Sequence, residues 1–238
     1  MIPLHDDNPT EIVPLITIAF IIACVLAFFY QISLGPRAGQ LFVYQFGAIP
    51  AVIFGRESLP REVLAVPASL SLITSMFLHG GFMHLIGNML YLWIFGNNIE
   101  DAMGHARFVV FYLICGLAAA MSHALTDPGS TVPMIGASGA ISGVLGAYLL
   151  LYPRARVLTL IPLGFFMQTF SLPASVLLGF WFVLQLISGA LTAGQGGGGV
   201  AWFAHIGGFA AGMILIGFFK RRSVRFFNPP HRRPSRHL

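Results

Sequence analysis

Charged residues are scarce in this chain. Asp, Glu, Lys and Arg make up 9% of the 238 residues, whereas roughly a quarter of a typical soluble domain is charged. Apolar residues make up 56%, and the mean hydropathy is +0.81. A composition with so little charge excludes an ordinary soluble globular protein and predicts an integral protein of a lipid bilayer.

Cysteine is nearly absent as well. Cys24 and Cys115 are the two cysteines of the chain, and both fall within apolar runs. A small buried thiol is the usual state of a cysteine in such a run. We therefore expect neither a disulfide nor a metal site from this pair.

Long apolar runs, in contrast, are frequent. A spanning helix needs about twenty predominantly apolar residues, and the chain offers six candidates. The first follows acidic residues and no base, so it does not resemble a cleaved signal peptide. Pro162 and Pro173 interrupt the apolar stretch after the fourth, so residues 157–171 are predicted to form an interfacial or partly re-entrant piece. The six predicted spans are 12–34, 82–99, 107–125, 137–152, 172–191 and 200–219.

These spans predict one domain with short extensions. The expected fold class is an all-α membrane protein, a bundle of six transmembrane helices. Residues 1–11 form a short N-terminal segment, residues 12–220 the membrane domain and residues 221–238 a basic tail.

Lysine and arginine residues indicate the orientation. Six spans place both termini on one side, which collects ten of the thirteen bases, seven of them between Lys220 and Arg236. An excess of bases marks the cytoplasmic side. An RNA-binding tail would look similar, but this tail directly follows an apolar span, so we expect no nucleic-acid partner. Residues 35–81 then form a long first external loop, rich in Phe, Ile and Pro, that is expected to lie in the membrane interface.

Polar residues occur near the start of three of the spans. His84 and Asn88 lie in the second, Ser138 in the fourth and His205 in the sixth. Alternate spans run in the same direction, so these residues are expected at one level near the external side. From Ser138 to its end the fourth span covers about 22 Å, less than a hydrocarbon core of about 30 Å. Ser138 should therefore lie below the outer surface, in a cavity open to external water.

Ser138 and His205 are a candidate catalytic pair. A serine hydroxyl is a weak nucleophile until a base takes its proton, and an ionisable residue inside an apolar span is a functional hypothesis by default. The eight acidic residues lie outside the spans or at their cytoplasmic ends, and Asp127 belongs to an Asp-Pro-Gly turn. We therefore expect a Ser–His dyad in which packing and helix geometry, rather than a carboxylate, orient His205.

His84 and Asn88 lie four residues apart, on one face of a helix. With the backbone N–H of Ser138 they are candidate donors to the oxyanion of an acyl-transfer reaction. Zinc binding by His79 and His84 is an alternative, but two histidines on either side of a helix start are poor metal geometry, and the motif His-Glu-x-x-His is absent. We expect no metal and no cofactor.

Small residues line the fourth and sixth spans. Gly139 and Gly143 belong to a stripe on one, and Gly208 and Gly212 lie on nearly the same face as His205 on the other. Such stripes let transmembrane backbones approach closely. The glycines by themselves are explained by helix packing without any chemistry. The functional interpretation depends on His205, which lies on nearly the same face.

Together, these segments resemble the rhomboid intramembrane serine proteases. The resemblance covers roughly residues 12–220, and the combination of motifs is far more specific than any one of them. The motifs are Gly-Ala-Ser-Gly at 136–139, Ala-His-Ile-Gly-Gly at 204–208 with Gly212, His79, His84 and Asn88 spaced as H-x4-H-x3-N, and an E-x-x-x-G-x-x-R pattern at 100–107.

The resemblance implies a six-helix, rhomboid-like fold in which Ser138 is the nucleophile and His205 the general base and acid. His84, Asn88 and the Ser138 amide would stabilise the oxyanion, and the fifth span and first external loop would control lateral access of a substrate helix. The glycine-rich loop at 194–199 suits a mobile cap over the site, although a flexible connector has the same composition. The residues implied as structural near the site are His79, Gly136, Gly139, Gly208 and Gly212.

One position departs from the pattern. In some rhomboids the residue four after the nucleophile is a tyrosine that stacks on the catalytic histidine, whereas here it is Ser142. The orientation of His205 is therefore the least determined part of the predicted site.

The predicted function is cleavage of peptide bonds in or near transmembrane segments of membrane proteins. One alternative is an inactive rhomboid-like protein that binds or escorts membrane proteins, but such proteins typically lack the serine or the histidine. A transporter or channel is another, but no inverted repeat is present. Without a transit peptide or long soluble extension, the chain is expected in a prokaryotic plasma membrane.

Overall fold

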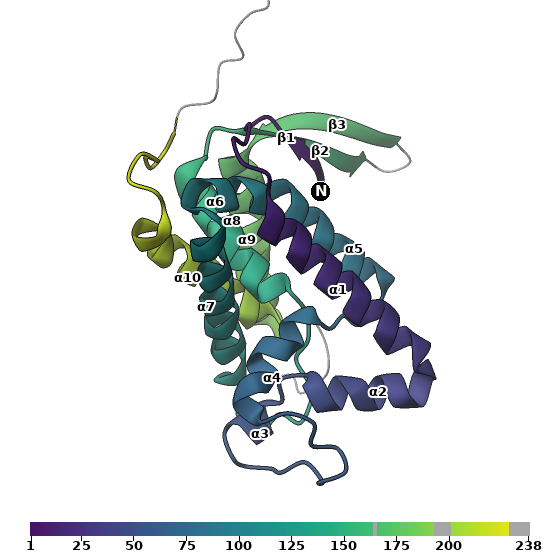
Figure 1. Cartoon of the computed structure of the whole chain (residues 1–238). Coiled ribbons are helices and arrows are strands. Elements are labelled where there is room, and N and C mark those ends of the chain that lie inside the picture. Colours follow the sequence, from purple (N-terminus) through teal and green to yellow (C-terminus); the bar gives the residue numbers. More distant parts are fainter. Residues whose placement is uncertain (164–165, 193–200, 229–238) are drawn as a thin grey trace, which may run out of the picture.

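The computed structural model describes residues 1–163, 166–192 and 201–228, and most of them are helical (Figure 1). The helical elements are α1 (Leu15–Ser33), α2 (Gly35–Phe46), α3 (Pro50–Ile53), α4 (Ala68–Thr74), η1 (Ser75–Phe77), α5 (Phe82–Tyr91), η2 (Leu92–Gly96), α6 (Asn97–Met103), α7 (His105–Ala124), α8 (Ser138–Leu151), α9 (Ala174–Thr192) and α10 (Trp202–Phe219). The strands are β1 (Ile2–Asp6), β2 (Arg156–Leu163) and β3 (Phe166–Pro173).

Helical structure covers nearly the same residues as the predicted spans. Among the described residues, four helices are long and apolar enough to cross a membrane, namely α1, α7, α9 and α10. The segments Ala68–Phe77 and Phe82–Met103 pass the same test together, although they are bent by 85°, and would make a fifth span. The apolar helix α8 has 14 residues. The predicted helical membrane bundle is thus confirmed, whereas the count of six spans stays a prediction.

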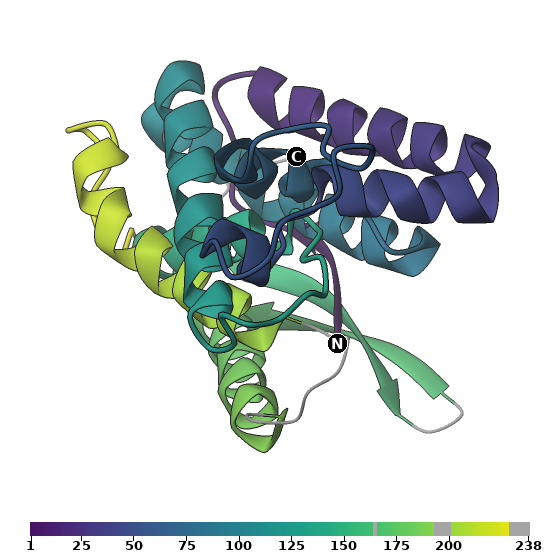
Figure 2. The ribbon, with the colours of Figure 1, turned by 90° about the horizontal axis from the view of Figure 1, so that it is seen from below.

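Three helices begin at the same end of the molecule. α5, α8 and α10 start near α2, α3 and α4 and run toward the end that carries the strands, while α1, α7 and α9 run the opposite way (Figure 1). Seen from below, α2, α3 and the chain that follows α3 lie across this end (Figure 2). The region predicted as a long external loop, 35–81, is therefore largely built of short helices.

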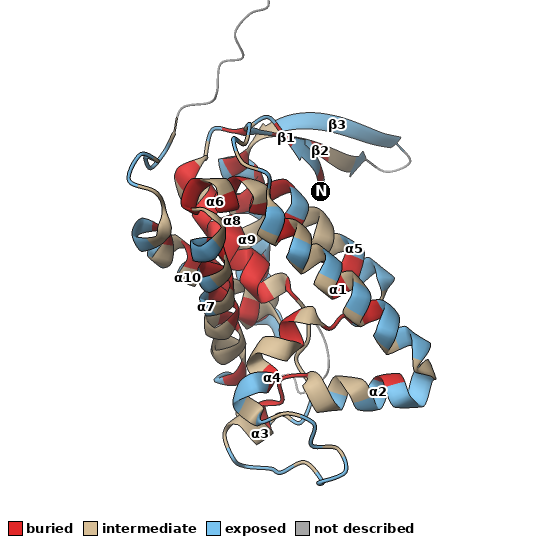
Figure 3. Ribbon diagram, viewed as in Figure 1, coloured by how far each residue is buried: buried red, intermediate tan, exposed pale blue. Residues whose placement is uncertain are grey.

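α8 is the most buried helix of the bundle. Eleven of its 14 residues are buried (Figure 3). It contacts α7 and α10 through positions that have no side chain: a Cβ at Gly143 would lie 2.5 Å from the Cβ of Cys115, and a Cβ at Gly212 would overlap the Gly143 carbonyl. The backbones of α8 and α10 are therefore in direct contact, as small-residue stripes allow.

A buried carboxylate fixes the start of α1. Glu100, on α6, accepts hydrogen bonds from the backbone N–H groups of Ile16 and Thr17 at 2.9 and 2.8 Å, and from the Thr17 hydroxyl at 2.7 Å. Because α1 has no capping side chain of its own, Glu100 pairs N–H groups that every helix leaves free at its first turn. Glu100 also bonds to Nδ1 of His105 at 2.6 Å. The E-x-x-x-G-x-x-R segment thus ties α1 to α6 and α7.

The stretch 157–171, predicted from its prolines to be an interfacial or partly re-entrant piece, is built of strands. It forms an antiparallel hairpin of β2 and β3, and β1 pairs with the other edge of β2. Burial alternates along the first half of β2, where Val157 and Thr159 are buried and Arg156 and Leu158 are exposed, which is the period of a strand. The predicted all-helical bundle therefore carries, in addition, a small sheet at the end opposite Ser138 (Figure 1).

Candidate active site

Ser138 and His205 meet across the contact between α8 and α10. Ser138 is the first residue of α8, and His205 lies in the first turn of α10. Ser138 Oγ is 2.8 Å from His205 Nε2, a hydrogen-bonding distance. The two residues are 67 positions apart in the sequence, so the parallel course of these helices and the close approach at Gly208 and Gly139 bring them together.

The second ring nitrogen of His205 also has a partner. Nδ1 lies 2.7 Å from Oε1 of Gln185 on α9, and Gln185 is 6% exposed. The sequence does not single out Gln185, and it predicts that packing and helix geometry orient the histidine. The one signal that could have found it is an amide inside an otherwise apolar span.

Aromatic rings surround His205 although Ser142 stands where some rhomboids have tyrosine. The Trp181 ring lies 5.9 Å from the histidine ring, at an interplanar angle of 36°, and the Trp202 ring lies 6.3 Å away, almost perpendicular. Ser142 instead donates a hydrogen bond to the Ser138 carbonyl at 2.7 Å. Tryptophans on α9 and α10 therefore supply the aromatic contact.

His84 lies beside Ser138 with one nitrogen already paired. The Gly80 N–H donates to His84 Nδ1 at 3.2 Å, so neutral His84 carries its proton on Nε2. A Cβ built on Gly136 would lie 2.8 Å from that Nε2 and 3.6 Å from Ser138 Oγ. Gly136 thus lies between the side chains of His84 and Ser138, and the Nε2–H of His84 is a proton donor close to the serine.

Asn88 and His79 have different surroundings. Asn88 is buried one turn after His84 on α5 and donates to the His84 carbonyl at 3.0 Å. His79 is fully buried before α5, its carbonyl accepts a hydrogen bond from Gln31 of α1 at 3.1 Å, and its ring lies 5.1 Å from that of His84. His79 therefore joins α1 to the start of α5. Among the described residues, no group of three His, Cys, Asp or Glu has the geometry of a metal site.

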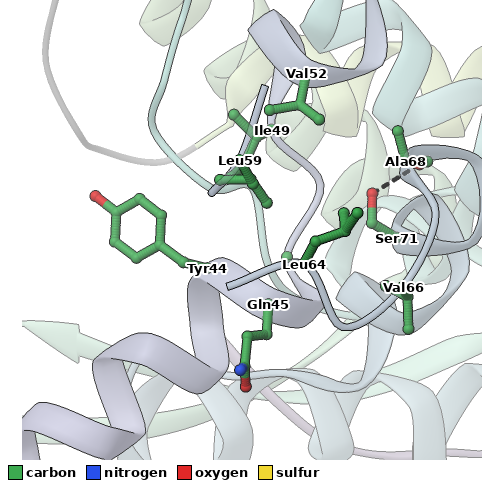
Figure 4. A pocket seen from close by; sticks show the side chains of 10 residues that line it. Tyr44, Gln45, Ile49, Val52, Leu59, Leu64, Val66, Ala68 and Ser71 are labelled. Atoms are coloured by element: carbon green, nitrogen blue, oxygen red, sulfur yellow. Dashed lines mark hydrogen bonds between the residues drawn. The ribbon is translucent and has the colours of Figure 1, made fainter. Parts of the chain in front are cut away.

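Residues 194–199, predicted as a cap, lie outside the described residues. A small cavity of about 10 Å³ lies within the region 35–81, lined mostly by apolar residues that include Ile49, Val52 and Leu64, and none of the predicted site residues lines it (Figure 4).

Comparison with known proteins identifies the family. The family model described as the Rhomboid domain matches residues 68–222. The chain belongs to the rhomboid family. All of the predicted site residues, from His79 to Gly212, lie within the matched range.

Several rhomboid proteins are similar to this chain. Rhomboid protease GluP of Bacillus subtilis is 30% identical over 213 residues, which are 88% of this chain and 37% of that protein. Rhomboid protein 1, mitochondrial, of Saccharomyces cerevisiae is 29% identical over 199 residues, covering 76% of this chain and 54% of the relative. RHOMBOID-like protein 5 of Arabidopsis thaliana is 32% identical over 180 residues, which are 75% of this chain and 53% of that protein.

The chain spans about half the length of the curated relatives that it matches. Some of those relatives are named proteases. The family and the apolar helices make this rhomboid an integral membrane protein. Because the relatives include mitochondrial, plant and bacterial proteins, the comparisons point to no particular membrane, and the expected prokaryotic plasma membrane has no support from them.

Proposed function

We propose that this rhomboid is an intramembrane serine endopeptidase that cleaves peptide bonds in or near the transmembrane segments of membrane proteins. The observation that carries the proposal is the 2.8 Å distance between Ser138 Oγ and His205 Nε2. A serine and a histidine in hydrogen-bond contact are the minimum for nucleophilic catalysis by a hydroxyl group. Both belong to helices of the membrane bundle, so the substrate is a segment that reaches the bilayer.

The first chemical step is attack by Ser138. Neutral His205 accepts the hydroxyl proton at Nε2 while Oγ bonds to the carbonyl carbon of the scissile peptide bond, whose π electrons move to the carbonyl oxygen. The backbone N–H of Ser138, at the N-terminus of α8, lacks an intrahelical partner and donates to this oxyanion. His84 Nε2–H and the Asn88 amide are the further donors.

In the second step the peptide bond is cleaved and an acyl-enzyme forms, which water then hydrolyses. Protonated His205 gives its proton to the leaving amine, the C–N bond breaks, and an ester of Ser138 remains. Water then attacks this ester with His205 as base, and the serine hydroxyl is restored. The same histidine therefore serves as base and acid in turn, without a metal or cofactor among the groups named.

Substrate access is proposed from the side of α9. This helix carries Gln185 and Trp181 toward His205, and its outer face exposes Phe180, Val183 and Ile187. An apolar outer face is suited to contact with lipid or with the apolar helix of a substrate. Displacement of α9, together with the external region 35–81, would admit that helix to Ser138.

The orientation proposed places the sheet end in the cytoplasm and the Ser138 end toward the external face. Arg107, Arg154 and Arg156 lie at the sheet end, as does the start of the basic tail, whereas the opposite end has three bases at Arg37, Arg56 and Arg61. The excess of bases marks the cytoplasmic side. Water for the second step then comes from the external side.

The test is cleavage of a transmembrane substrate by purified protein in detergent or liposomes. Ser138→Ala and His205→Ala should each lower kcat/KM by about a thousandfold or more, and Asn88→Ala should lower it by about a hundredfold. Ser175→Ala, which removes an exposed hydroxyl at the start of α9, is the matched control and should cleave at the wild-type rate. Cleavage by Ser138→Ala at the wild-type rate would show the proposal to be wrong.

A binding or escort role without catalysis is the second candidate. Labelling by a serine-directed fluorophosphonate separates the two, because it needs an activated hydroxyl. The protease should be labelled, and Ser138→Ala should not. Absence of both labelling and cleavage in the folded wild-type protein would favour the binding role.

A further inference from the structure

Gln185 is a buried amide in an apolar helix. It is 6% exposed, whereas Leu184 and Leu186 on either side of it are more than 40% exposed. A buried amide in a membrane helix is unfavourable unless both ends are hydrogen-bonded. Here both ends are: Oε1 lies 2.7 Å from His205 Nδ1, and Nε2 lies 3.3 Å from the Trp181 carbonyl oxygen.

These two contacts determine which nitrogen of His205 carries the proton. The Trp181 carbonyl only accepts, so the end of the amide that faces it is the NH2 group. The carbonyl end of Gln185 then faces Nδ1, which must be the donor. Neutral His205 is therefore protonated at Nδ1, and Nε2 presents its lone pair to the Ser138 hydroxyl 2.8 Å away.

We infer that Gln185 is a positioning residue that holds neutral His205 in its Nδ1–H tautomer for proton abstraction from Ser138. The inference rests on the proposed protease function. The role is the one that a buried carboxylate has in Ser-His-Asp triads. An amide fulfils it without a charge, which makes it far less costly to bury in a membrane helix than a carboxylate.

The aromatic neighbours cannot perform this role. Trp181 and Trp202 pack around the imidazole and restrict its tilt, but their rings do not discriminate between the two neutral tautomers. The amide does, and the Trp181 carbonyl prevents its reversal. A reversed amide would donate to Nδ1 and move the proton to Nε2, which could then no longer accept from Ser138.

Kinetics of three variants test the inference. Gln185→Leu keeps the size of the side chain but removes the acceptor, so kcat should fall about 10- to 100-fold, a part of what general-base catalysis contributes, while KM stays within about twofold. Gln185→Glu keeps an acceptor oxygen and should retain activity within about tenfold of wild type at pH 8. The control is Thr192→Val, which removes a side-chain hydrogen bond within α9 away from His205 and should leave kcat unchanged.

A spectroscopic measurement tests the tautomer directly. In protein with ¹⁵N-labelled histidine, the His205 signals, assigned by their loss in His205→Ala, should report a proton on Nδ1 in the wild type. In Gln185→Leu the Nε2–H form should become populated. Wild-type His205 protonated at Nε2 when neutral would overturn the inference whether or not any variant folds.

The outcomes separate this inference from the proposed function. If Ser138→Ala cleaves like the wild type, both are wrong. If Ser138→Ala is inactive but Gln185→Leu cleaves at the wild-type rate, the protease stands and the role of Gln185 is wrong. Equal losses in Gln185→Leu and Gln185→Glu would assign the residue to packing, which also overturns the inference.

Discussion

Gly136 has a backbone conformation that side chains rarely adopt, with φ at +123°. Its N–H donates to the Ser75 carbonyl at 2.9 Å, which ties the turn before α8 to the segment before α5. The absence of a Cβ leaves room for His84, whose Nε2 would lie 2.8 Å from one. A single glycine therefore sets the separation between the proposed oxyanion donor and Ser138.

Gly136→Ala should lower kcat about 10-fold or more, because the new methyl group displaces His84 from the oxyanion position. Backbone strain should also cost about 1–3 kcal/mol of stability. The measurements are cleavage kinetics and thermal unfolding in detergent. The matched control is Gly55→Ala, where φ is +67° but nothing lies within 4 Å of the added Cβ. Equal activity in the two variants would contradict the role given to Gly136.

Asp6 is a buried carboxyl at the opposite end of the molecule, in β1. It accepts hydrogen bonds from the Tyr148 hydroxyl at 2.6 Å and from the Asn98 amide at 3.1 Å. Burial raises the pKa of Asp6 from the ordinary 3.8 to about 6, although the Tyr148 hydrogen bond opposes the change. The folded protein therefore binds this proton more tightly than the unfolded chain does.

The contribution of Asp6 to the stability of the wild type should consequently fall as the pH rises from 4 to 6. The stabilisation from the protonated carboxyl is complete below about pH 4 and is lost as the pH passes 6, by up to about 3 kcal/mol. Asp6→Asn, which resembles the protonated form, should lose this part of the pH dependence and be more stable than wild type at pH 7–8. The measurement is the unfolding temperature of wild type and variant between pH 4 and 8. Glu57→Gln, which changes a carboxylate in an exposed loop, is the control. Parallel curves for wild type and Asp6→Asn would refute the prediction.

At the scale of elements, the contact between α8 and α10 determines whether the predicted dyad can form. Gly208 lies against the Gly139 carbonyl, and Gly212 against the Gly143 carbonyl. His205 precedes these glycines on α10 by one and two helical turns. Any separation of the two helices therefore moves Nε2 away from Ser138 Oγ.

Gly212→Ala should reduce both stability and activity, because its Cβ overlaps backbone that cannot move aside as a side chain does. Overpacking of this kind costs about 1–3 kcal/mol. Thermal unfolding and cleavage rates provide the measurements. Gly179→Ala on α9 has nothing within 4 Å of the added Cβ and should be neutral or slightly stabilising. Equal stability and activity of the two variants would mean that the contact between α8 and α10 can accommodate an added methyl group, and the prediction would be wrong.

Helix direction is the part of the site that sequence predicts well. Whether two spans start on the same side depends only on the number of crossings between them, so the placement of Ser138 and His205 at one level follows without knowledge of packing. Their contact depends, in addition, on the packing of α8 against α10. Gln185 does not follow, because the rotation of α9 about its own axis decides where a single amide points. The β2–β3 hairpin does not follow either, since a short apolar run broken by prolines fits a strand and an interfacial segment alike.

At the scale of the whole molecule, the two ends differ in charge and in architecture. The sheet end collects β1, the hairpin and the start of the basic tail, where the Arg221 N–H bonds to the Ala102 carbonyl and the Phe227 N–H to the Leu150 carbonyl. The other end consists of the short helices of 35–81 and the starts of the helices that carry Ser138 and His205. The sidedness of the proposed chemistry therefore depends on which end faces the cytoplasm.

Cysteine accessibility in cells that express the protein decides the orientation. Cys24 and Cys115 are buried and free, so replacing both by alanine gives a background for single cysteines. Glu57→Cys, in the exposed loop after α3, should react with a membrane-impermeant maleimide in intact cells, whereas Thr169→Cys, exposed on β3, should react only after permeabilisation. The expectation follows from seven bases at the sheet end, counted among the described residues, against three at the other. The reverse pattern would place Ser138 toward the cytoplasm, and the water that hydrolyses the acyl-enzyme would then come from that side.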